Sequence, residues 1–523
     1  MKTMSAVVHG ARMSYAVRSW VYCVALGMVA CGGTGGGTSG TTYLLSVTLT
    51  GTGSGRVTSN PVAIDCGLNC SASLESGTSA TLTAVPAAGS DFTGWSGSCS
   101  GSSTCTLTID AAKTVTARFT SNRVAFISYR KLDGSDGANA NGTSNIWRVN
   151  GDGTGLMALT TGTSIGARVN GNGPAATRFS PDGTRIVFRS SRKLDGTDAP
   201  NINETMNIWR VNHDGAGLMP LTNATALDAD SYAPQWSPDG SKVVFHSFRK
   251  IDGTDAANTN LAANIWQVNA DGTGLRIITN TTALGANSAS PQWSPDGTKV
   301  VFSSARKLDG SDAANLNRTF NIWRANADGT GLMPLTTATA ASADSSFPQW
   351  SPDGSQIVFQ STRKLDGSDA PNPNGTSNIW RVNADGTGLR IITNTTAMNS
   401  YSLAPQWSPD GSKVVFESAR KLDGSDSANV NMTLNVWRSN ADGTSLTALT
   451  RLSAPNAHSL EPRVSPDGTR IIFYSARKLD GTDAPNPNLT LNVWRMNADG
   501  TGAMPLTSAV SNGASSFSPS PSP

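Results

Sequence analysis

A long internal repeat dominates this chain and limits it to few architectures. The motif Ser-Pro-Asp-Gly begins, at constant spacing, at Ser180, Ser237, Ser294, Ser351, Ser408 and Ser465. An Asn-aliphatic-Trp triplet occurs seven times, from Asn145 to Asn492, with the same spacing after a longer first interval. A constant period of this length indicates one supersecondary unit that buries its hydrophobic surface against copies of itself.

Each repeat contains four short apolar segments separated by turn residues. In one copy, residues 290–293 and 299–303 flank a Pro-Asp-Gly turn, and the Asp-Gly pair favours a hairpin. Residues 321–326 follow a long loop, and an Asp-Gly-Thr-Gly turn joins them to residues 332–336. Neighbouring Ile and Trp residues in the third segment are typical of strands buried on both faces. We therefore predict an all-β fold, a seven-bladed β-propeller of four-stranded antiparallel blades.

The two ends of the repeat array indicate how the ring closes. The first repeat starts at Arg123 with the second strand of the pattern and lacks the first. Residues 515–519 match a first strand and are not followed by a second. One blade is therefore expected to combine three strands from the start of the array with one from its end, which leaves no open sheet edge. A six-bladed ring with the first repeat as an appendage is the alternative.

The motifs SPDGTRIVF and NIWRVNADGTG and the Leu-Thr that ends each repeat resemble the TolB-type, WD-like propeller repeat. The resemblance covers residues 123–517. It implies a periplasmic interaction protein, or the non-catalytic half of a peptidase or lyase. TolB itself has an α/β domain before a six-bladed ring, so a role in the Tol–Pal system is not carried over.

A small domain with four cysteines precedes the repeats. Residues 43–120 alternate apolar and polar positions, the pattern of half-buried strands. An even number of cysteines in a short exported domain indicates disulfides, and we favour the local pairs Cys66–Cys70 and Cys99–Cys105 among three connectivities. Zinc is the alternative, although the cysteine spacing is poor for a zinc finger.

The same stretch contains GSGRVTSNP, IDCGLNC and GWSGSCSGSSTC. These motifs resemble the bacterial repeat domain related to internalin B-repeats. The resemblance implies a surface spacer or adhesion-type module and brings no chemistry with it.

The N-terminus is typical of an export signal. Lys2, Arg12 and Arg18 precede an apolar run over residues 20–30, too short to span a bilayer. Small or apolar residues directly before Cys31 resemble a bacterial lipobox, which implies lipidation of this cysteine and anchoring at the outer membrane. Ordinary secretion is the alternative. We expect a monomer in the cell envelope that touches the membrane only through this lipid.

These features divide the chain. The expected parts are a lipoprotein signal peptide (1–30), a Gly/Ser/Thr-rich tether (31–42), the small β domain (43–120), the propeller (123–517) and a tail (518–523). Lys and Arg number 40 and Asp and Glu 37, and removal of the signal peptide takes away three cations. The mature chain is therefore neutral, which excludes a nucleic-acid-binding protein held by clustered positive charge.

Each repeat carries an Arg-Lys-Leu/Ile-Asp-Gly loop in which two Asp and two Asn keep a fixed spacing. Carboxylate and amide oxygens suit calcium, the one cofactor that the sequence indicates. The interpretation that we favour is that the same side chains order the loop through Asx-turns and hydrogen bonds to backbone, with calcium as the alternative. The candidate calcium ligands are Asp133, Asp136, Asp195, Asp198, Asp252, Asp255, Asp309, Asp312, Asp366, Asp369, Asp423, Asp426, Asp480 and Asp483.

Seven nearly identical copies favour a lipid-anchored, non-catalytic scaffold that binds an envelope protein or polymer, so we expect no enzyme and no catalytic residue. The face with the long Arg-Lys-Leu-Asp-Gly loops is the expected binding face. The alternative is a channel-type enzyme, carbohydrate-active or peptidase-related, which needs a unique acid, base or metal cluster in one blade. The departures of that kind are His213, His246, His458, Glu204, Glu417 and Glu461. They share no evident spacing.

Overall fold

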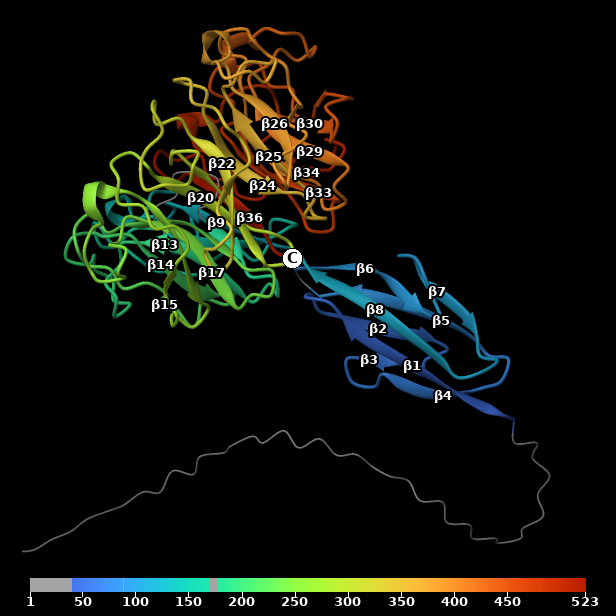
Figure 1. Cartoon of the computed structure of the whole chain (residues 1–523). Helices are drawn as coiled ribbons and strands as arrows, with labels where there is room; N and C mark the ends of the chain where they lie inside the picture. The colour runs from blue at the N-terminus through green and yellow to red at the C-terminus, as the bar shows by residue number, and fades with distance from the viewer. Residues whose placement is uncertain (1–39, 88, 170–176) are drawn as a thin grey trace, which may run out of the picture.

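The computed structural model describes residues 40–87, 89–169 and 177–523. The expected signal peptide, Cys31 and most of the tether lie outside these residues. The described chain forms a small β domain and a larger ring of sheets, with the C-terminus between them (Figure 1). Among the described residues, no helix combines the length and apolar character needed to cross a membrane.

The small domain consists of two four-stranded sheets, ordered β4-β1-β8-β6 and β3-β2-β5-β7, in which only β1 and β8 pair in parallel. Its strands are β1 (Thr42–Thr50), β2 (Gly55–Asn60), β3 (Asp65–Cys66), β4 (Ser71–Glu75), β5 (Ser79–Pro86), β6 (Ser90–Gly97), β7 (Cys105–Thr108) and β8 (Lys113–Ser121). Alternate residues such as Leu45, Val57 and Val115 are buried between the sheets, as their period of two predicts. Disulfides Cys66–Cys70 and Cys99–Cys105 form the favoured pairs.

Residues 123–521 contain the repeated sheets. The strands are β9 (Arg123–Ser128), β10 (Asn145–Asn150), β11 (Met157–Ala158), β12 (Thr177–Phe179), β13 (Arg185–Ser190), β14 (Asn207–Asn212), β15 (Met219–Pro220), β16 (Ser231–Trp236), β17 (Lys242–Ser247), β18 (Asn264–Asn269), β19 (Arg276–Ile277), β20 (Ser288–Trp293), β21 (Lys299–Ser304), β22 (Asn321–Asn326), β23 (Met333–Pro334), β24 (Ser345–Trp350), β25 (Gln356–Ser361), β26 (Asn378–Asn383), β27 (Arg390–Ile391), β28 (Ser402–Trp407), β29 (Lys413–Ser418), β30 (Asn435–Asn440), β31 (Thr447–Ala448), β32 (Ser459–Val464), β33 (Arg470–Ser475), β34 (Asn492–Asn497), β35 (Met504–Pro505) and β36 (Ser516–Pro521). Single turns of 3₁₀ helix in five of the long loops are η1 (Ala140–Gly142), η2 (Thr259–Leu261), η3 (Pro373–Gly375), η4 (Val430–Met432) and η5 (Pro487–Leu489).

These strands form seven four-stranded antiparallel sheets within the described residues. Six sheets use consecutive strands, from β12-β13-β14-β15 to β32-β33-β34-β35. The seventh has the order β11-β10-β9-β36, so three early strands pair with the last one, as the ends of the repeat array predict. β36 continues to Pro521, beyond the expected boundary at residue 517, so residues 518–523 are not a free tail.

Hydrophobic side chains join each sheet to the next around the ring. The largest are the third-strand tryptophans, all 2% exposed or less: Trp147, Trp209, Trp266, Trp323, Trp380, Trp437 and Trp494. In the closing cluster, Phe126 and Trp147 of one sheet pack with Ile472 and Val493 of another. Because each sheet is buried on both faces, the repeats stabilise one another as the blades of a β-propeller do.

The Ser-Pro-Asp-Gly turn is held by its own side chains. In the copy after β20, the Asp296 carboxylate accepts the Ser294 hydroxyl at 2.5 Å and the backbone N–H of Thr298 at 3.0 Å. Gly297 follows with a φ of +69°, a conformation that favours glycine. These contacts explain why the motif recurs with the hairpin between first and second strands.

Candidate functional site

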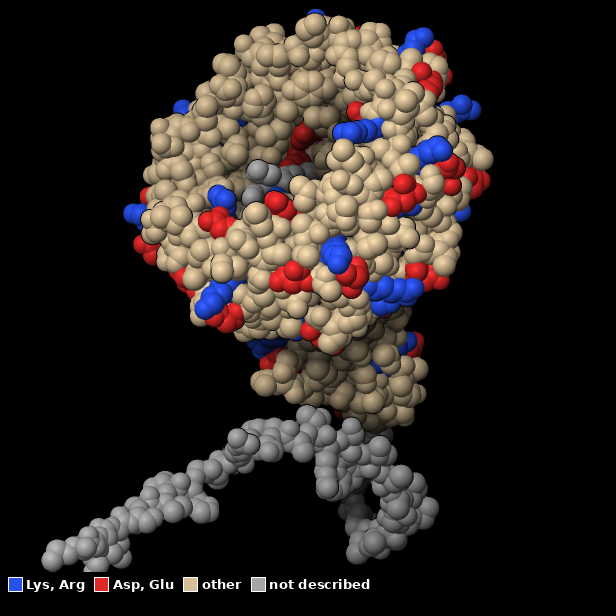
Figure 2. All heavy atoms as spheres, turned by 60° about the vertical axis from the view of Figure 1, so that its left-hand side comes forward, with Lys and Arg blue, Asp and Glu red and all other residues tan. Residues whose placement is uncertain are grey.

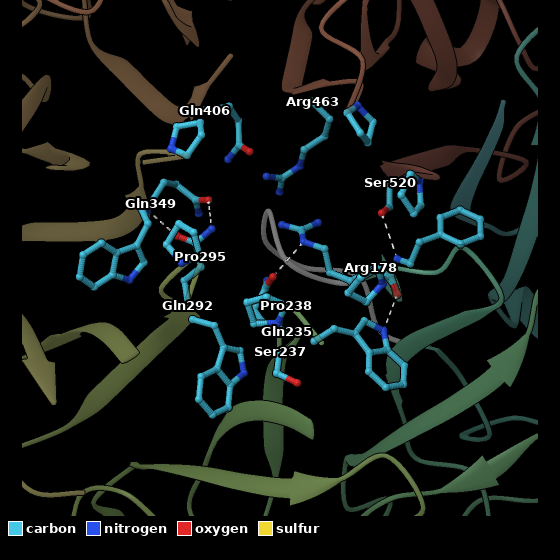
Figure 3. A pocket seen from close by; sticks show the side chains of 18 of the residues that line it. Arg178, Gln235, Ser237, Pro238, Gln292, Pro295, Gln349, Gln406, Arg463 and Ser520 are labelled. Carbon is cyan, nitrogen blue, oxygen red and sulfur yellow. Dashed lines mark hydrogen bonds between the residues drawn. The ribbon is translucent and has the colours of Figure 1, made fainter. Parts of the chain in front are cut away.

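The first strands of the sheets line a central channel. β12, β16, β20, β24, β28, β32 and β36 contact one another in turn and close a circle. The end of the channel beside the Ser-Pro-Asp-Gly turns contains a cavity of about 420 Å³, lined by first-strand side chains and by turn residues such as Pro238 and Pro295 (Figure 3). The opposite end carries the long loops, and Figure 2 shows acidic atoms deep inside an opening through the ring.

One repeat position supplies a side chain from every first strand to this cavity. We call these seven residues the mouth ring: Arg178, Gln235, Gln292, Gln349, Gln406, Arg463 and Ser520. Gln292 donates to the side-chain oxygen of Gln349 at 2.7 Å, and Arg178 donates to that of Gln235 at 3.2 Å. The ring therefore offers amide donors and acceptors on one side and two guanidinium groups on the other.

The two arginines of the mouth ring flank Ser520 and point toward the middle of the cavity (Figure 3). Arg463 is only 5% exposed, and its Nε has no hydrogen-bond partner among the described residues. Burial lowers the pKa of both Arg463 and Arg178, and each is also influenced by the Glu461 carboxyl. The sequence signal that marks this pair is the replacement of Gln by Arg in the Pro-Gln-Trp motif.

A β-bulge interrupts most first strands above the mouth ring. The bulge residues have φ between 47° and 54°, and they are Ala233, Ser290, Phe347, Ala404, Glu461 and Ser518. A bulge redirects a side chain out of the regular alternation of a strand. The single carboxyl among them belongs to Glu461.

Glu461 meets a second unique acid from the neighbouring sheet. Its backbone N–H donates to Oε2 of Glu417, on β29, at 2.6 Å. Gln360 of the preceding repeat makes the same contact, because its side-chain oxygen accepts the backbone N–H of Ala404 at 3.0 Å. The two acids come from different repeats and therefore show no evident spacing in the sequence. They are neighbours in space because the second strand of one sheet lies next to the bulge in the first strand of the following sheet.

The surroundings of this carboxyl pair change its proton affinity. Burial raises the pKa of Glu417 to about 7, and the nearby Glu461 carboxyl adds to the effect. Burial also raises the pKa of Glu461, while Arg463 and Arg178 act in the opposite direction. Glu417 therefore keeps its proton to a higher pH than an exposed glutamic acid does.

The other departures from the repeat have separate structural surroundings. His246 stacks on Tyr232, with ring centroids 5.5 Å apart, and burial lowers its pKa to about 3. His458 Nδ1 accepts the backbone N–H of Leu434 at 3.0 Å. Glu204 lies 3.6 Å from Arg168 in an exposed ion pair. These side chains do not join the carboxyl pair.

A Gly-x-Ser-x-Gly pattern at residues 162–166 does not form a nucleophile site. Ser164 lies in the connection between β11 and β12, and its hydroxyl donates to the backbone oxygen of Asp198 at 2.6 Å. A nucleophile elbow needs a strand followed directly by a helix, and neither flanks this serine.

The loop aspartates predicted as calcium ligands have two kinds of hydrogen-bond partner. The first Asp of each loop accepts a backbone N–H two residues later, as Asp309 does from Ser311 at 2.9 Å. In most loops it also pairs with the preceding lysine, as with Lys307 at 2.9 Å. The first aspartates are Asp133, Asp195, Asp252, Asp309, Asp366, Asp423 and Asp480.

The second Asp of each loop bonds to the connection between two sheets, which for Asp312 is the segment between β19 and β20. Asp312 accepts the backbone N–H groups of Thr282 at 2.9 Å and Ala283 at 3.1 Å. The equivalent residues are Asp136, Asp198, Asp255, Asp312, Asp369, Asp426 and Asp483. No group of three or more His, Cys, Asp or Glu side chains comes together within the described ranges, and calcium binding stays a prediction.

Comparison with known proteins supports the division into two parts. Residues 45–123 match the divergent InlB B-repeat domain family. A putative TolB from Agrobacterium tumefaciens superposes with a TM-score of 0.38 and 19% identity, covering 66% of this chain and 95% of that one. Residues 45–123 thus resemble a known domain family, and the chain is similar in structure to a putative TolB.

Peptidases are also among the similar proteins. A puromycin-hydrolyzing peptidase from Mycobacterium tuberculosis has a TM-score of 0.49 and 15% identity, covering 74% of this chain and 52% of that one. The protein named uncharacterized peptidase YuxL of Bacillus subtilis (strain 168) is 25% identical over 241 residues, which are 42% of this chain. The match spans about a third of that relative's length.

This sequence relative corrects one expectation. The near-identity of the repeats led us to expect a protein without enzymatic activity, yet a relative with the name of a peptidase aligns to a large part of the chain. The expectation was wrong because it relied on the positions that are the same in every repeat. It treated the few residues that differ between repeats as if they were far apart in the structure. Two of those residues, Glu417 and Glu461, are in direct contact across the interface between two sheets.

Proposed function

We propose that this TolB-like propeller is a peptidase-related enzyme of the cell envelope that acts on peptides in its central channel. The observation that carries the proposal is the contact between Glu417 and Glu461, the two unique acids of adjacent sheets. The name of the relative from Bacillus subtilis supports peptide as the substrate class. The repeats supply a rigid seven-bladed ring, and the departures from the repeat supply the chemistry.

The carboxyl pair has the properties that hydrolysis of an amide needs. In the proposed step, ionised Glu461 takes a proton from a water molecule whose oxygen attacks the peptide carbonyl carbon. Protonated Glu417 gives its proton to the amide nitrogen, the C–N bond breaks, and a carboxylic acid and an amine result. Burial keeps Glu417 protonated near neutral pH, which suits the role of acid.

Two substitutions test this proposal, and the chain itself supplies their templates. Glu417→Gln copies Gln360 and keeps an acceptor for the N–H of residue 461, while Glu461→Ala copies Ala404 at a similar backbone angle. We expect each to lower peptide hydrolysis at least ~100-fold, the usual contribution of a general acid or base. The matched control is Gln360→Glu, which places an acid in the equivalent contact without a second carboxyl.

The measurement is release of new amino groups from a mixed peptide library at pH 7, with melting temperatures to verify folding. Hydrolysis by wild-type protein that both variants retain would contradict the assignment of the pair. The absence of hydrolysis by the wild-type protein would contradict the enzyme itself.

The location rests on the N-terminus and on the InlB-like domain. We propose that the chain is exported, cleaved before Cys31 and anchored in the outer membrane by a lipid on this residue. The match of residues 45–123 to a divergent InlB B-repeat domain supports an envelope protein. Cys31→Ser should release the protein from the membrane fraction and remove acyl mass from its N-terminus; unchanged fractionation would argue for ordinary secretion.

A second proposal concerns the face with the long loops. We propose that this face binds a protein partner through an apolar patch on that partner. Its lysines are paired with aspartates of their own loops, as Lys250 is with Asp252 at 2.9 Å, and Figure 2 shows basic and acidic atoms side by side. Between these pairs, Ile165, Ile202 and Leu316 are at least 72% exposed. Exposed apolar side chains among self-neutralised charges favour a protein over a charged polymer. Ile202→Asp with Leu316→Asp should abolish capture of such a partner from envelope fractions.

A further inference from the structure

The mouth ring carries a feature that the carboxyl pair does not explain. Four of its seven positions are Gln, whereas two of the three neighbouring positions on the other side are Arg463 and Arg178, with Ser520 between them. Serine is the smallest side chain in the ring, so it leaves space between the two guanidinium groups. Figure 3 shows both arginines directed toward the middle of the cavity.

A buried guanidinium N–H without a hydrogen-bond acceptor is costly. Arg463 is only 5% exposed, and its Nε has no acceptor among the described residues. Leaving a buried donor unsatisfied costs free energy that a bound acceptor would recover, most of all an anionic one. Ser520 is available to donate from its hydroxyl, because the described contact of that group is as an acceptor, from the backbone N–H of Phe179 at 3.4 Å.

We propose that Arg463, Arg178 and Ser520 form a carboxylate-binding subsite that holds the C-terminal carboxylate of a peptide. The inference rests on the proposed function, because it names the end of the peptide that the channel engages. Guanidinium groups bind a carboxylate through two parallel N–H donors, and Arg463 can present such a pair. Arg178 donates from Nε to Gln235 at 3.2 Å and from Nη1 to the backbone oxygen of Thr177 at 3.0 Å, so its contribution is the positive charge from the neighbouring sheet.

The subsite and the carboxyl pair each include a residue of β32. Arg463 follows Glu461 by two residues on β32, and the pKa shifts of the two side chains reflect their proximity. A peptide whose terminus is held at Arg463 therefore presents its last residues to Glu461. The activity is expected to be exopeptidase-like, removing residues from the C-terminal end.

The glutamine-rich side of the ring fits the same ligand. Gln235 and Gln406 line the cavity with amide groups that can both donate and accept, as the backbone of an extended peptide requires. Gln406 donates its side-chain N–H to the backbone oxygen of Pro405 at 2.9 Å, which leaves its oxygen as an acceptor beside Arg463. Neutral amides hold the chain without competing for the carboxylate.

The test separates binding from hydrolysis by using the full-length Glu417→Gln variant, which keeps the mouth ring. The probes are N-acetyl-trialanine with a free carboxylate and the same peptide with a C-terminal amide, measured by calorimetric titration. We expect the free acid to bind at least tenfold more tightly, in line with charge-assisted hydrogen bonds. Equal affinity for the two peptides, or no binding of either, would overturn the proposal.

Substitutions in the Glu417→Gln background locate the effect. Arg463→Gln copies Gln406, and Arg178→Gln copies Gln235, so each should fold and reduce the preference for the free acid below threefold. The matched control is Arg324→Gln on β22, because the equivalent position of β18 is Gln267 and lies outside the channel. The control should keep the full preference; a loss equal to that of Arg463→Gln would mean that only overall charge matters.

Two further outcomes distinguish this inference from the proposed function. Strong preference for the free acid without hydrolysis by wild-type protein would keep the subsite and remove the enzyme. Binding of trigalacturonate, a polymer acid, with no binding of the acetylated peptide would overturn the peptide ligand and assign the arginines to sugar carboxylates.

Discussion

The long-loop face and the channel are built from the same repeats but differ in how those repeats vary. Around the outer loops, all seven copies use Asp in the same two roles, a turn acceptor and a bond to the connection between two sheets. On the second strands, which pair with the strands that line the channel, one repeat position differs in every copy: Ile127, Arg189, His246, Ser303, Gln360, Glu417 and Tyr474. Uniform positions assemble the ring, and varied positions give it one distinct site.

The largest effect should come from breaking the ring that both regions share. Deleting residues 512–523 removes β36 and leaves an unpaired edge on β9. It also removes Phe517, which packs at the interface between two sheets. We expect a fall in melting temperature of about 10 °C or more, or aggregation, because several kcal/mol are lost. A truncated protein that melts like the full-length one would show that the ring does not need this strand.

A smaller effect concerns the channel alone. Glu417 has a folded pKa of about 7, above its ordinary 4.5, so the folded protein holds this proton more tightly than the unfolded chain does. The stabilisation is complete below pH about 4.5 and is lost as pH rises through about 7. Relative to Glu417→Gln, the free energy of unfolding of wild-type protein should fall by up to about 3 kcal/mol over this window.

Urea unfolding at pH 4.5, 6 and 8 measures this difference. The matched control is Glu204→Gln, since Glu204 is an exposed acid on the loops. Parallel pH profiles of wild-type protein and Glu417→Gln would contradict the buried, protonated state of Glu417.

The smallest effect should follow a change in a single loop. Asp312→Asn weakens the bonds to Thr282 and Ala283 but leaves six equivalent loops intact. We expect a loss of less than about 2 kcal/mol in chelator, since this carboxylate is near solvent. Asp369→Asn, the same change one repeat later, should cost a similar amount.

Calcium sharpens this last comparison. Repeating the melts of wild-type protein, Asp312→Asn and the pair Asp309→Asn with Asp312→Asn in millimolar Ca²⁺ separates two roles of the loop. If the loops bind calcium, Ca²⁺ should raise the melting temperature of wild-type protein, and it should raise that of the substituted proteins by a smaller amount. Equal melting with calcium and with chelator would assign these aspartates to hydrogen bonding alone.

The periodicity of the sequence was enough to predict the all-β fold, the strand order and the pairing of the last strand with the first ones. The alternation along each strand and the constant length of the repeat indicate which positions are buried. The buried positions in turn determine where the strands lie and how they pair. The strand ends were predicted less well: the fourth strands shrink to two residues both in copies with a proline, as in Met333–Pro334, and in copies without one, as in Arg276–Ile277.

The candidate site was harder to predict because its parts come from different repeats. Glu417 and Glu461 occupy different positions of the repeat unit, and only the packing of one sheet on the next brings them together. The arginines of the mouth ring were detectable in principle, since Arg178 and Arg463 replace the Gln that four other copies share in the Pro-Gln-Trp motif. Aligning the repeats for their differences, position by position, would have found them.

The pairing of β36 with β9 also sets a timetable for folding. β9 is synthesised early, and its partner β36 is the last strand of the ring to be synthesised. The edge of the first sheet therefore stays exposed while the other six sheets are synthesised. Contacts this distant in sequence form slowly, and an unpaired edge invites association with other chains. Ser522 then bonds to Ser121 at 2.8 Å and Thr52 to Pro523 at 2.6 Å, so completion of the ring and docking of the small domain become one late event.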